Sequence, residues 1–253
     1  MSSDRLLVYT CITGGYDRLE APGFDAEGVD FVCLSDTDID VPAPWVTRRL
    51  PEMGVGARDL SRYAKMHPHL LFPHHQSSVY VDGNIAVVSD PRPLVADALR
   101  SHDLALYEHP LRDCAYEEAR ECARIGHDWS FNLWRQMRRY RRQGFPARAG
   151  LLEGGIIIRN HRSESVRQLM EAWWRAFKGG VRRDQLSLPF LAWQMGVQIG
   201  NLGPSDARFA HRFFELRADH CRALPPQTLR RGKINRLLAR VGGRDRATNS
   251  SPA

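Results

Sequence analysis

Short apolar segments rich in strand-forming residues alternate with longer segments of helical periodicity along most of this chain. The strand-like segments are residues 5–13, 29–36, 78–88, 104–110 and 153–160. The helical segments are residues 55–66, 111–126, 130–144 and 163–180. Strands that alternate with helices favour parallel pairing, because a helix can serve as the crossover between two parallel strands. The sequence therefore predicts an α/β fold with a Rossmann-like, mostly parallel central sheet flanked by helices.

The length and charge of the chain fit one folded domain followed by a basic tail. We expect residues 1–224 to form the domain, and residues 225–253 to form a basic helix and a disordered end. The formal net charge is +7, and only three of the 36 Lys and Arg residues are lysines. This charge permits phosphorylated small molecules, anionic lipid or nucleic acid as partners, and it does not choose among them.

Cysteine usage and hydropathy indicate where the protein works. The five cysteines are scattered without a C-x-x-C pair, so neither a zinc site nor a disulfide framework is predicted. No segment has the ~20 apolar residues that cross a bilayer, and the first residues lack a signal-peptide core. We therefore expect a cytoplasmic protein. Arginine-rich residues 135–143 and 229–240 add an expectation of peripheral contact with the inner face of an anionic membrane, with solvated helix faces as the alternative.

The segment SSVYVDGNIAV, residues 77–87, places Asp82, Gly83 and Asn84 between two apolar runs. A hairpin tip would explain this pattern, because Asp-Gly and Gly-Asn are turn formers. The alternative is a binding site, since ligands of open α/β sheets lie beyond the carboxyl ends of the strands. The oxygens of Asp82 and Asn84 would suit Mg²⁺ or Mn²⁺ beside a diphosphate.

A basic stripe precedes this segment on a predicted helix. Arg58, Arg62 and Lys65 are spaced i, i+4 and i+7, which places them on one helix face. They are candidates to neutralise phosphate charge, and Lys65 is the preferred member. A solvated basic face is the competing interpretation.

Polar and small residues also follow the first two predicted strands. Thr13 and Gly14 precede Tyr16, whose ring could stack on a nucleobase, and Asp36 ends the second strand. These four residues are candidates for nucleotide binding. A tight turn at the glycines and a turn cap at Asp36 are the alternatives.

Five segments in the same order resemble the TOD/MUCI-type glycosyltransferase-like domain family. They are VYTCITGGYDRL (8–19), YVDGN (80–84), HPLRDCAYEEA (109–119), EGGIIIRNH (153–161) and RRDQLSLPFLAW (182–193). The order also resembles that of family 8 retaining transferases. This resemblance implies an A-type nucleotide-sugar-binding fold. It also implies transfer of a sugar from a nucleoside diphosphate, with UDP the expected nucleotide, to a glycan, lipid-linked or small-molecule acceptor.

The resemblance also assigns roles to individual residues. Glu153, Gly154 and Gly155 are similar to the family 8 strand that flanks the sugar, and Asp184-Gln185 is similar to its D-Q segment. Glu153, Asp184 and Gln185 are therefore the catalytic candidates, and the two glycines are nucleotide-sugar-binding candidates. The sequence departs from that pattern at Glu153, which replaces an amide.

A second departure concerns the metal. Asn84 replaces the second carboxylate of the D-x-D motif, so the resemblance leaves a requirement for Mn²⁺ or Mg²⁺ open. His211 and His220 are the candidate third ligands from the C-terminal region, and His211 is the preferred one. His109 and Arg112 are candidates for contact with the sugar or the acceptor. A retaining or an inverting outcome is not decided by the sequence.

Two other functions compete with sugar transfer. One is a basic module that binds RNA or another anionic polymer without catalysis, although no nucleic-acid partner is expected under the main interpretation. The other is a metal-dependent hydrolase built on His67, His69, His74 and His75. Two prolines interrupt this cluster, and surface histidines are its preferred interpretation.

Overall fold

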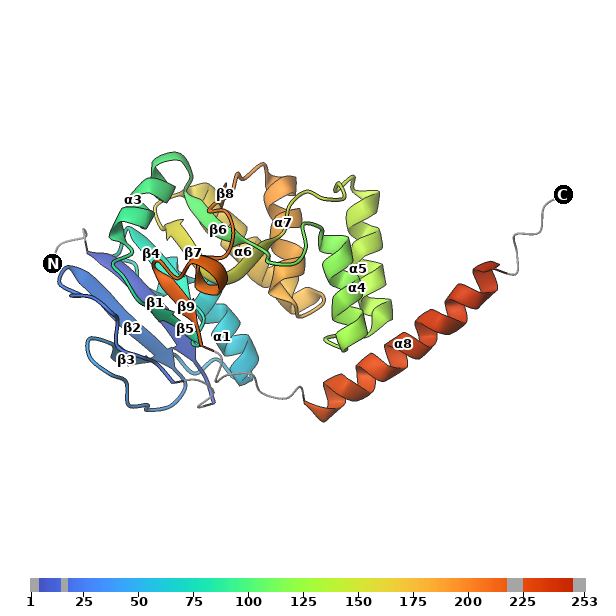
Figure 1. Ribbon diagram of the computed structural model, residues 1–253, viewed down its shortest axis with the longest axis horizontal. Helices are drawn as coiled ribbons and strands as arrows, with labels where there is room; N and C mark the ends of the chain where they lie inside the picture. The colour runs from blue at the N-terminus through green and yellow to red at the C-terminus, as the bar shows by residue number, and fades with distance from the viewer. Residues whose placement is uncertain (1–4, 15–17, 218–224, 248–253) are drawn as a thin grey trace.

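Strands from both halves of the chain form one central sheet in the computed structural model, which describes residues 5–14, 18–217 and 225–247 (Figure 1). Its strands are β1 (Leu6–Ile12), β2 (Val29–Ser35), β3 (Val46–Arg49), β4 (Ser77–Val81), β6 (Leu104–Glu108), β7 (Leu152–Asn160) and β8 (Gly200–Asn201). They are ordered β3-β2-β1-β4-β7-β6-β8. All pairs are parallel except those of β7, which runs antiparallel to both β4 and β6. The predicted α/β class and mostly parallel sheet are confirmed.

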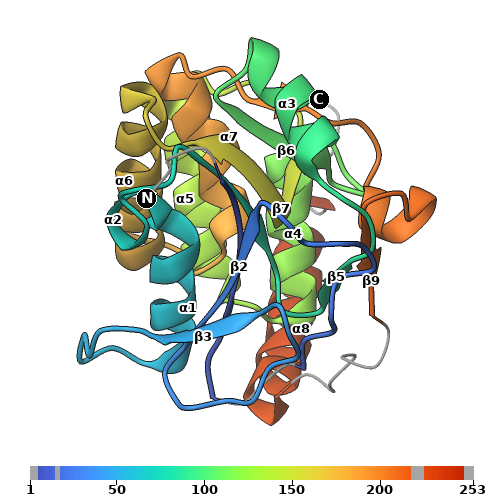
Figure 2. The ribbon, with the colours of Figure 1, turned by 90° about the vertical axis from the view of Figure 1, so that its left-hand side faces the viewer.

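Helices cover both faces of this sheet (Figure 2). They are α1 (Ala57–Met66), α2 (Pro68–Leu71), α3 (Arg92–Ser101), α4 (Ala115–Ile125), α5 (Ser130–Arg142), α6 (Glu164–Gly179), α7 (Asp184–Met195), the π-helix η1 (Asp206–Ala210) and α8 (Pro226–Ala247). One apolar core lies beneath α1, α4, α5, α6 and α7, and the other lies beneath α3. Leu7 and Tyr9 of β1 face the first core, whereas Leu6 and Val8 face the second. This alternation explains why β1 is buried along its whole length.

The segment predicted as a single third strand is two strands. β4 ends at Val81, and β5 (Ile85–Val87) pairs with β9 (Phe214–Leu216) in a separate two-stranded sheet. A turn joins β4 to β5, in which the Ile85 N–H donates to the Asp82 carbonyl oxygen at 2.9 Å. Because β5 does not pair with β4, the hairpin alternative is wrong. The turn instead emerges at the carboxyl end of β4.

The basic tail contributes a helix that packs on the domain. The side chain of Asn235 in α8 is buried and donates to the carbonyl oxygens of Ala123 and Asp128 at 2.8 and 2.9 Å. A Cβ atom on Gly232 would lie 2.5 Å from the Ile125 carbonyl oxygen, so the backbones of α8 and α4 approach closely there. Beyond this contact α8 projects away from the domain (Figure 1). Residues 248–253, the last part of the tail predicted to be partly disordered, lie outside the described residues.

None of the helices in the described part of the chain is long and apolar enough to cross a membrane.

Substitution of Gly232 by Ala is expected to release α8 from α4. The added methyl group overlaps backbone atoms of Arg124 and Ile125, which cannot move as a flexible side chain would. We expect a loss of about 1–3 kcal/mol in the free energy of unfolding and faster tryptic cleavage within α8. Gly179→Ala is the control, because a Cβ there meets nothing within 4 Å. Unchanged proteolysis of Gly232→Ala would contradict the docking described here.

Candidate functional site

A cavity lies beyond the carboxyl end of β4, where α1, β7, α7 and η1 come together. Nine residues predicted from the sequence line it: Arg62, Lys65, Asp82, Asn84, Glu153, Gly154, Gly155, Asp184 and Gln185. These residues come from four separate segments of the chain. Their convergence at one edge of the sheet is the position at which open α/β folds bind ligands.

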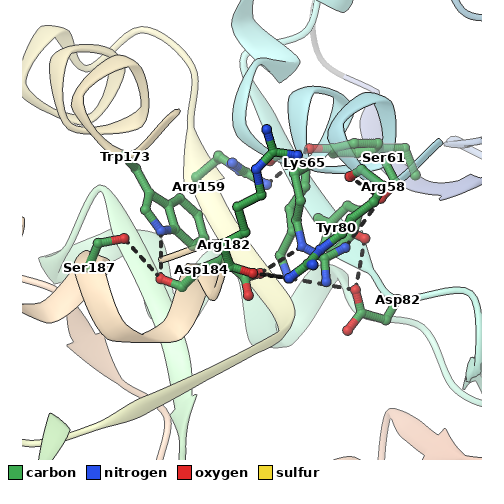
Figure 3. Close-up of polar contacts among 12 residues, drawn as sticks. Arg58, Ser61, Lys65, Tyr80, Asp82, Arg159, Trp173, Arg182, Asp184 and Ser187 are labelled. Carbon is green, nitrogen blue, oxygen red and sulfur yellow. Dashed lines mark hydrogen bonds and ion pairs between the residues drawn. The ribbon is translucent and has the colours of Figure 1, made fainter. Parts of the chain in front are cut away.

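Within this group, Lys65 lies close to both Asp184 and Asp82 (Figure 3). Its side chain is only 2% exposed, and its Nζ is 3.1 Å from Asp184 Oδ2 and 3.6 Å from Asp82 Oδ1. The apolar part of α1 packs into the core, which turns the last basic residue of the stripe inward. A buried ammonium group needs such partners, because an unpaired charge in the interior is strongly unfavourable.

Asp184 receives a second cation from the same helix. Arg62 Nε is 3.1 Å from Asp184 Oδ2, the oxygen that also contacts Lys65. Burial would raise the pKa of Asp184, but the charges of Lys65, Arg62 and Arg183 outweigh it and hold that pKa far below its ordinary value. The same carboxylate raises the pKa of Arg62. Asp184 and Arg62 are therefore both ionised at neutral pH.

The first turn of α7 fixes the position of this carboxylate. Trp173 Nε1–H donates to the Asp184 carbonyl oxygen at 2.8 Å, and the Ser187 hydroxyl donates to the same oxygen at 3.3 Å (Figure 3). The interpretation of Asp184 as a helix N-cap is wrong, because Arg183 occupies that position and makes no capping bond through its side chain. The Asp184 side chain is directed at the cations instead.

Two glycines of β7 make room for these groups. A Cβ atom on Gly154 would lie 3.0 Å from Lys65 Nζ, and one on Gly155 would lie 3.5 Å from Asp82 Oδ2. Neither glycine has a positive φ, so the requirement is for space and not for an unusual backbone conformation. Gly154 therefore leaves the space in which the lysine lies, whereas a Cβ on Gly155 would crowd Ile85 Cδ1 at 3.1 Å and meet Asp82 only at ordinary contact distance.

The Asp-Gly-Asn turn is held against β7. The Asp82 N–H donates to the Gly155 carbonyl oxygen at 2.8 Å, and the Tyr80 hydroxyl donates to Asp82 Oδ1 at 2.8 Å. Burial and the Asp82 charge raise the pKa of Tyr80 well above its ordinary value, so this hydroxyl remains a donor. The Asp82 side chain is still 37% exposed, and Asn84 lines the cavity beside it.

These two residues offer oxygen donors of the kind that Mg²⁺ and Mn²⁺ prefer. Within the described ranges, no group of three or more His, Cys, Asp or Glu residues is placed to hold a metal ion. His211, the preferred candidate for a third ligand, is exposed at the end of η1 and does not line the cavity, and His220 lies outside the described residues. A set of two protein oxygens still fits a cation whose other ligands are substrate phosphates and water.

The catalytic candidate Glu153 is already engaged by η1. The hydroxyl of Ser205 donates to its Oε1, and Arg208 Nε lies 3.1 Å from its Oε2. Sequence reasoning missed Ser205 and Arg208, because they lie in an irregular region with no periodic pattern. It also missed Arg183, although this cavity residue directly precedes Asp184. Gln185 lines the same wall, and its buried Oε1 has no hydrogen-bond partner among the residues that the structure describes.

The nucleotide-binding candidates lie at the ends of β1 and β2, along the same edge of the sheet. The Gly14 N–H donates to the Asp36 carboxylate, at 2.9 and 3.2 Å from its two oxygens. The Thr13 hydroxyl donates to the Ala57 carbonyl oxygen at 3.1 Å. Tyr16 lies outside the described residues. The structure thus brings three of these candidates together near the start of α1.

Three further candidates lie outside the cavity wall. Arg58 points toward the segment that precedes α7. Its guanidinium donates to the Arg182 carbonyl oxygen there (Figure 3). Arg112 Nε is 2.6 Å from the buried Glu118, and His109 Nε2 is 3.7 Å from the same oxygen. Burial lowers the pKa of His109, and Glu118 opposes this effect only in part.

Within the described part of the chain, the histidines between α1 and β4 are not placed to form a metal centre. His67 and His69 each place Nε2 3.4 Å from Glu171 Oε1, and His75 pairs with Asp30. Burial lowers the pKa of both His67 and His69. His67 is buried, so the expectation of surface histidines is wrong for it. Nothing in this arrangement supports the hydrolase alternative.

The depressed pKa of Asp184 predicts a pH dependence of stability. Because the folded-state pKa lies below the unfolded value of about 3.9, its contribution is present above about pH 4 and is lost as the pH falls further. Asp184→Asn should lose about 3–5 kcal/mol of unfolding free energy at pH 7, since Lys65 loses a buried partner. The variant should also lose less stability between pH 5 and pH 3 than the wild type.

Denaturant titrations at neutral and acid pH measure this difference, with Asp97→Asn at an exposed ion pair of α3 as the control. Parallel pH profiles for the wild type and Asp184→Asn would contradict the ion cluster.

Similar solved structures are glycosyltransferases of low sequence identity. The bifunctional glycosyltransferase WbbM is 11% identical, with 80% of this chain and 39% of that chain covered and a TM-score of 0.47. Mouse xyloside xylosyltransferase 1 is 10% identical, with coverage of 78% and 84% and a TM-score of 0.45. The galactosyltransferase LgtC, solved with donor and acceptor sugar analogs, is 13% identical, with coverage of 78% and 72% and a TM-score of 0.44. The chain spans less than half the length of WbbM.

A family model gives the more specific result. No curated protein sequence matches the chain significantly. The model of the TOD1/MUCI70, glycosyltransferase-like domain matches residues 56–210, which is more than half of the chain and contains all nine predicted residues of the cavity wall. The resemblance to this family is thereby confirmed, and four of the five sequence motifs lie within the matched residues. The chain belongs to the TOD1/MUCI70, glycosyltransferase-like domain family.

Proposed function

We propose that this protein transfers a sugar from a nucleoside-diphosphate sugar, with UDP as the nucleotide, to a hydroxyl group of a glycan, lipid-linked or small-molecule acceptor. The observation that supports this most strongly is the buried ammonium group of Lys65 at the cavity wall. It lies among Asp184, Asp82 and Gly154, which come from three other segments of the chain. The family membership supports the same reaction class.

The charges of the cavity suit a departing diphosphate. Its wall contains four cations, Arg62, Lys65, Arg183 and Arg208, and three carboxylates, Asp82, Glu153 and Asp184. When the bond between the sugar and the diphosphate breaks, negative charge develops on the phosphate oxygens. Fixed cations stabilise that charge without having to reorganise during the reaction. We assign this role to Lys65 and Arg62, which the fold already holds in place.

A divalent cation would add to this stabilisation. In the proposal, Asp82 and Asn84 would hold Mg²⁺ or Mn²⁺, with the diphosphate as a further ligand. The bound ion would supply positive charge to the phosphoryl oxygens. The Asp82 carboxylate is partly exposed and lies 3.6 Å from Lys65 Nζ, so it would serve both the cation and the lysine.

The two remaining carboxylates are poor candidates for a general base. Asp184 has a pKa far below neutral pH and two cationic partners, so it accepts a proton weakly. Glu153 accepts hydrogen bonds from Ser205 and Arg208. We therefore assign Asp184 to holding the cations and contacting the donor sugar together with Gln185. The departing phosphate oxygen would then take the proton of the acceptor hydroxyl.

Nucleotide binding should depend on Lys65. UDP at ~100 times its dissociation constant should stabilise the wild type by about 2.7 kcal/mol, which raises the melting temperature by roughly 5–10 °C. Lys65→Met should abolish this shift, because the diphosphate loses its buried cation. Lys178→Met is the matched control, since Lys178 also pairs with a buried carboxylate, Asp59, but does not line the cavity. An equal UDP shift in Lys65→Met and the wild type would contradict the proposal.

The metal proposal is tested through Asp82. We expect the UDP shift to increase when Mn²⁺ is added and to decrease when EDTA removes it. Asp82→Ala should make the shift insensitive to Mn²⁺ while Lys65 and Arg62 maintain part of the affinity. Asp97→Ala, at an exposed carboxylate of α3, should respond to Mn²⁺ like the wild type. If the UDP-induced shift of the wild type is the same with and without Mn²⁺, the metal role of Asp82 is refuted. The basic side chains would then be the whole diphosphate site.

A further inference from the structure

A groove of about 710 Å³ between α4 and α5 is separate from the cavity described above. Apolar and aromatic side chains form much of its wall, among them Tyr116, Ala119, Leu133 and Met137. Charged residues also line it, and all of them are arginines: Arg120, Arg138, Arg141 and Arg142. The reaction proposed above uses none of these residues.

The four groove arginines have no acidic partners within the described part of the chain. None of them forms an ion pair there, and no carboxylate lines the groove. Of the three acidic residues of α4, Glu118 pairs with Arg112 and Glu121 with Arg124, while Glu117 forms no ion pair within the described residues and does not line the groove. A cluster of unpaired guanidinium groups beside an apolar wall repels itself and attracts an anion.

Large aromatic side chains extend this surface into solvent. Phe131 and Trp134 of α5 are 62% and 54% exposed, and their rings stack with centroids 6.4 Å apart. Residues 131, 134, 135, 138 and 142 form one stripe along the helix, at spacings of three and four. The guanidinium of Arg138 lies 4.9 Å from the centre of the Trp134 ring. We call this stripe, with the groove beside it, the α5 face.

We propose that the α5 face docks on the surface of an anionic phospholipid bilayer. The arginines would contact lipid phosphates, and Phe131 and Trp134 would insert at the level of the headgroups, where amphipathic aromatic rings are favoured. The apolar wall of the groove would accept part of a lipid chain. A duplex nucleic acid would meet the arginines but leave the apolar wall unused, and a single strand would stack its bases on Phe131 and Trp134 without filling the groove beside Leu133 and Met137.

The docking is peripheral. Helix α5 has 13 residues and no acidic side chain, which fits a helix lying in the membrane interface and not one that crosses it. The proposal does not depend on the sugar-transfer reaction, because the groove and the cavity share no lining residue.

Sedimentation of the full chain with vesicles tests this assignment. The wild type should bind mixed vesicles of phosphatidylcholine and phosphatidylglycerol and should dissociate from them at high salt. It should not bind vesicles of phosphatidylcholine alone. Arg138→Gln/Arg142→Gln should weaken binding about 25-fold, at roughly fivefold for each basic residue removed. Arg49→Gln/Arg100→Gln removes the same charge from exposed positions on β3 and α3 and should weaken binding much less.

Tryptophan fluorescence provides a second readout. Lipids brominated in their acyl chains should quench the emission of the wild type, and Trp134→Phe should reduce that quenching. Circular dichroism should show the same fold for every variant, because the substituted side chains lie at the surface. Three results would each overturn the proposal: no binding to the anionic vesicles, equal weakening by the two double substitutions, or binding of poly(U) by the α5 face without binding of vesicles.

Discussion

The buried ion cluster of Lys65, Asp184 and Arg62 connects the fold to the site. An ammonium group that is 2% exposed persists only with close partners, and these come from the first turn of α7 and from the end of β4. Removing one partner of such a cluster leaves a buried charge and costs about 3–5 kcal/mol. The same contacts therefore hold α1, α7 and β4 together and hold a cation at the cavity wall.

Other parts of the molecule support this cluster. Gly154 leaves the space in which Lys65 lies, and Trp173 fixes the backbone of Asp184. Arg183 reaches the buried Glu118, which also binds Arg112. Each cation near the cavity thus has a carboxylate that orients it before any ligand arrives. Such preorganisation is what allows fixed charges to stabilise a departing diphosphate.

Local sequence patterns predicted the elements whose signal lies within their own residues. β1 and α6 were predicted correctly, because a continuous apolar run and a 3.6-residue period need no knowledge of partners. The break between β4 and β5 was not, since β5 pairs with β9, a strand of three residues that lies far along the chain. A pattern confined to residues 78–88 contains no information about that partner.

The site residues also divide into features that local sequence patterns predict and features that depend on distant parts of the chain. The basic stripe on α1 was predicted, yet only tertiary packing shows that Lys65 and Arg62 line the cavity while Arg58 does not. Glu153 was predicted from its motif. Its contact with Arg208 depends on a π-helix that no periodicity in the sequence predicts. Motif resemblance found the residues of the wall, and the fold determined their partners.

The most direct test of this account is a crystal structure of the protein with UDP and Mn²⁺. The account predicts that the β-phosphate lies within ion-pair distance of Lys65 Nζ, with the ion between that phosphate and Asp82. A diphosphate bound away from Lys65, or a complex in which Lys65 and Asp184 lie remote from the nucleotide, would contradict it.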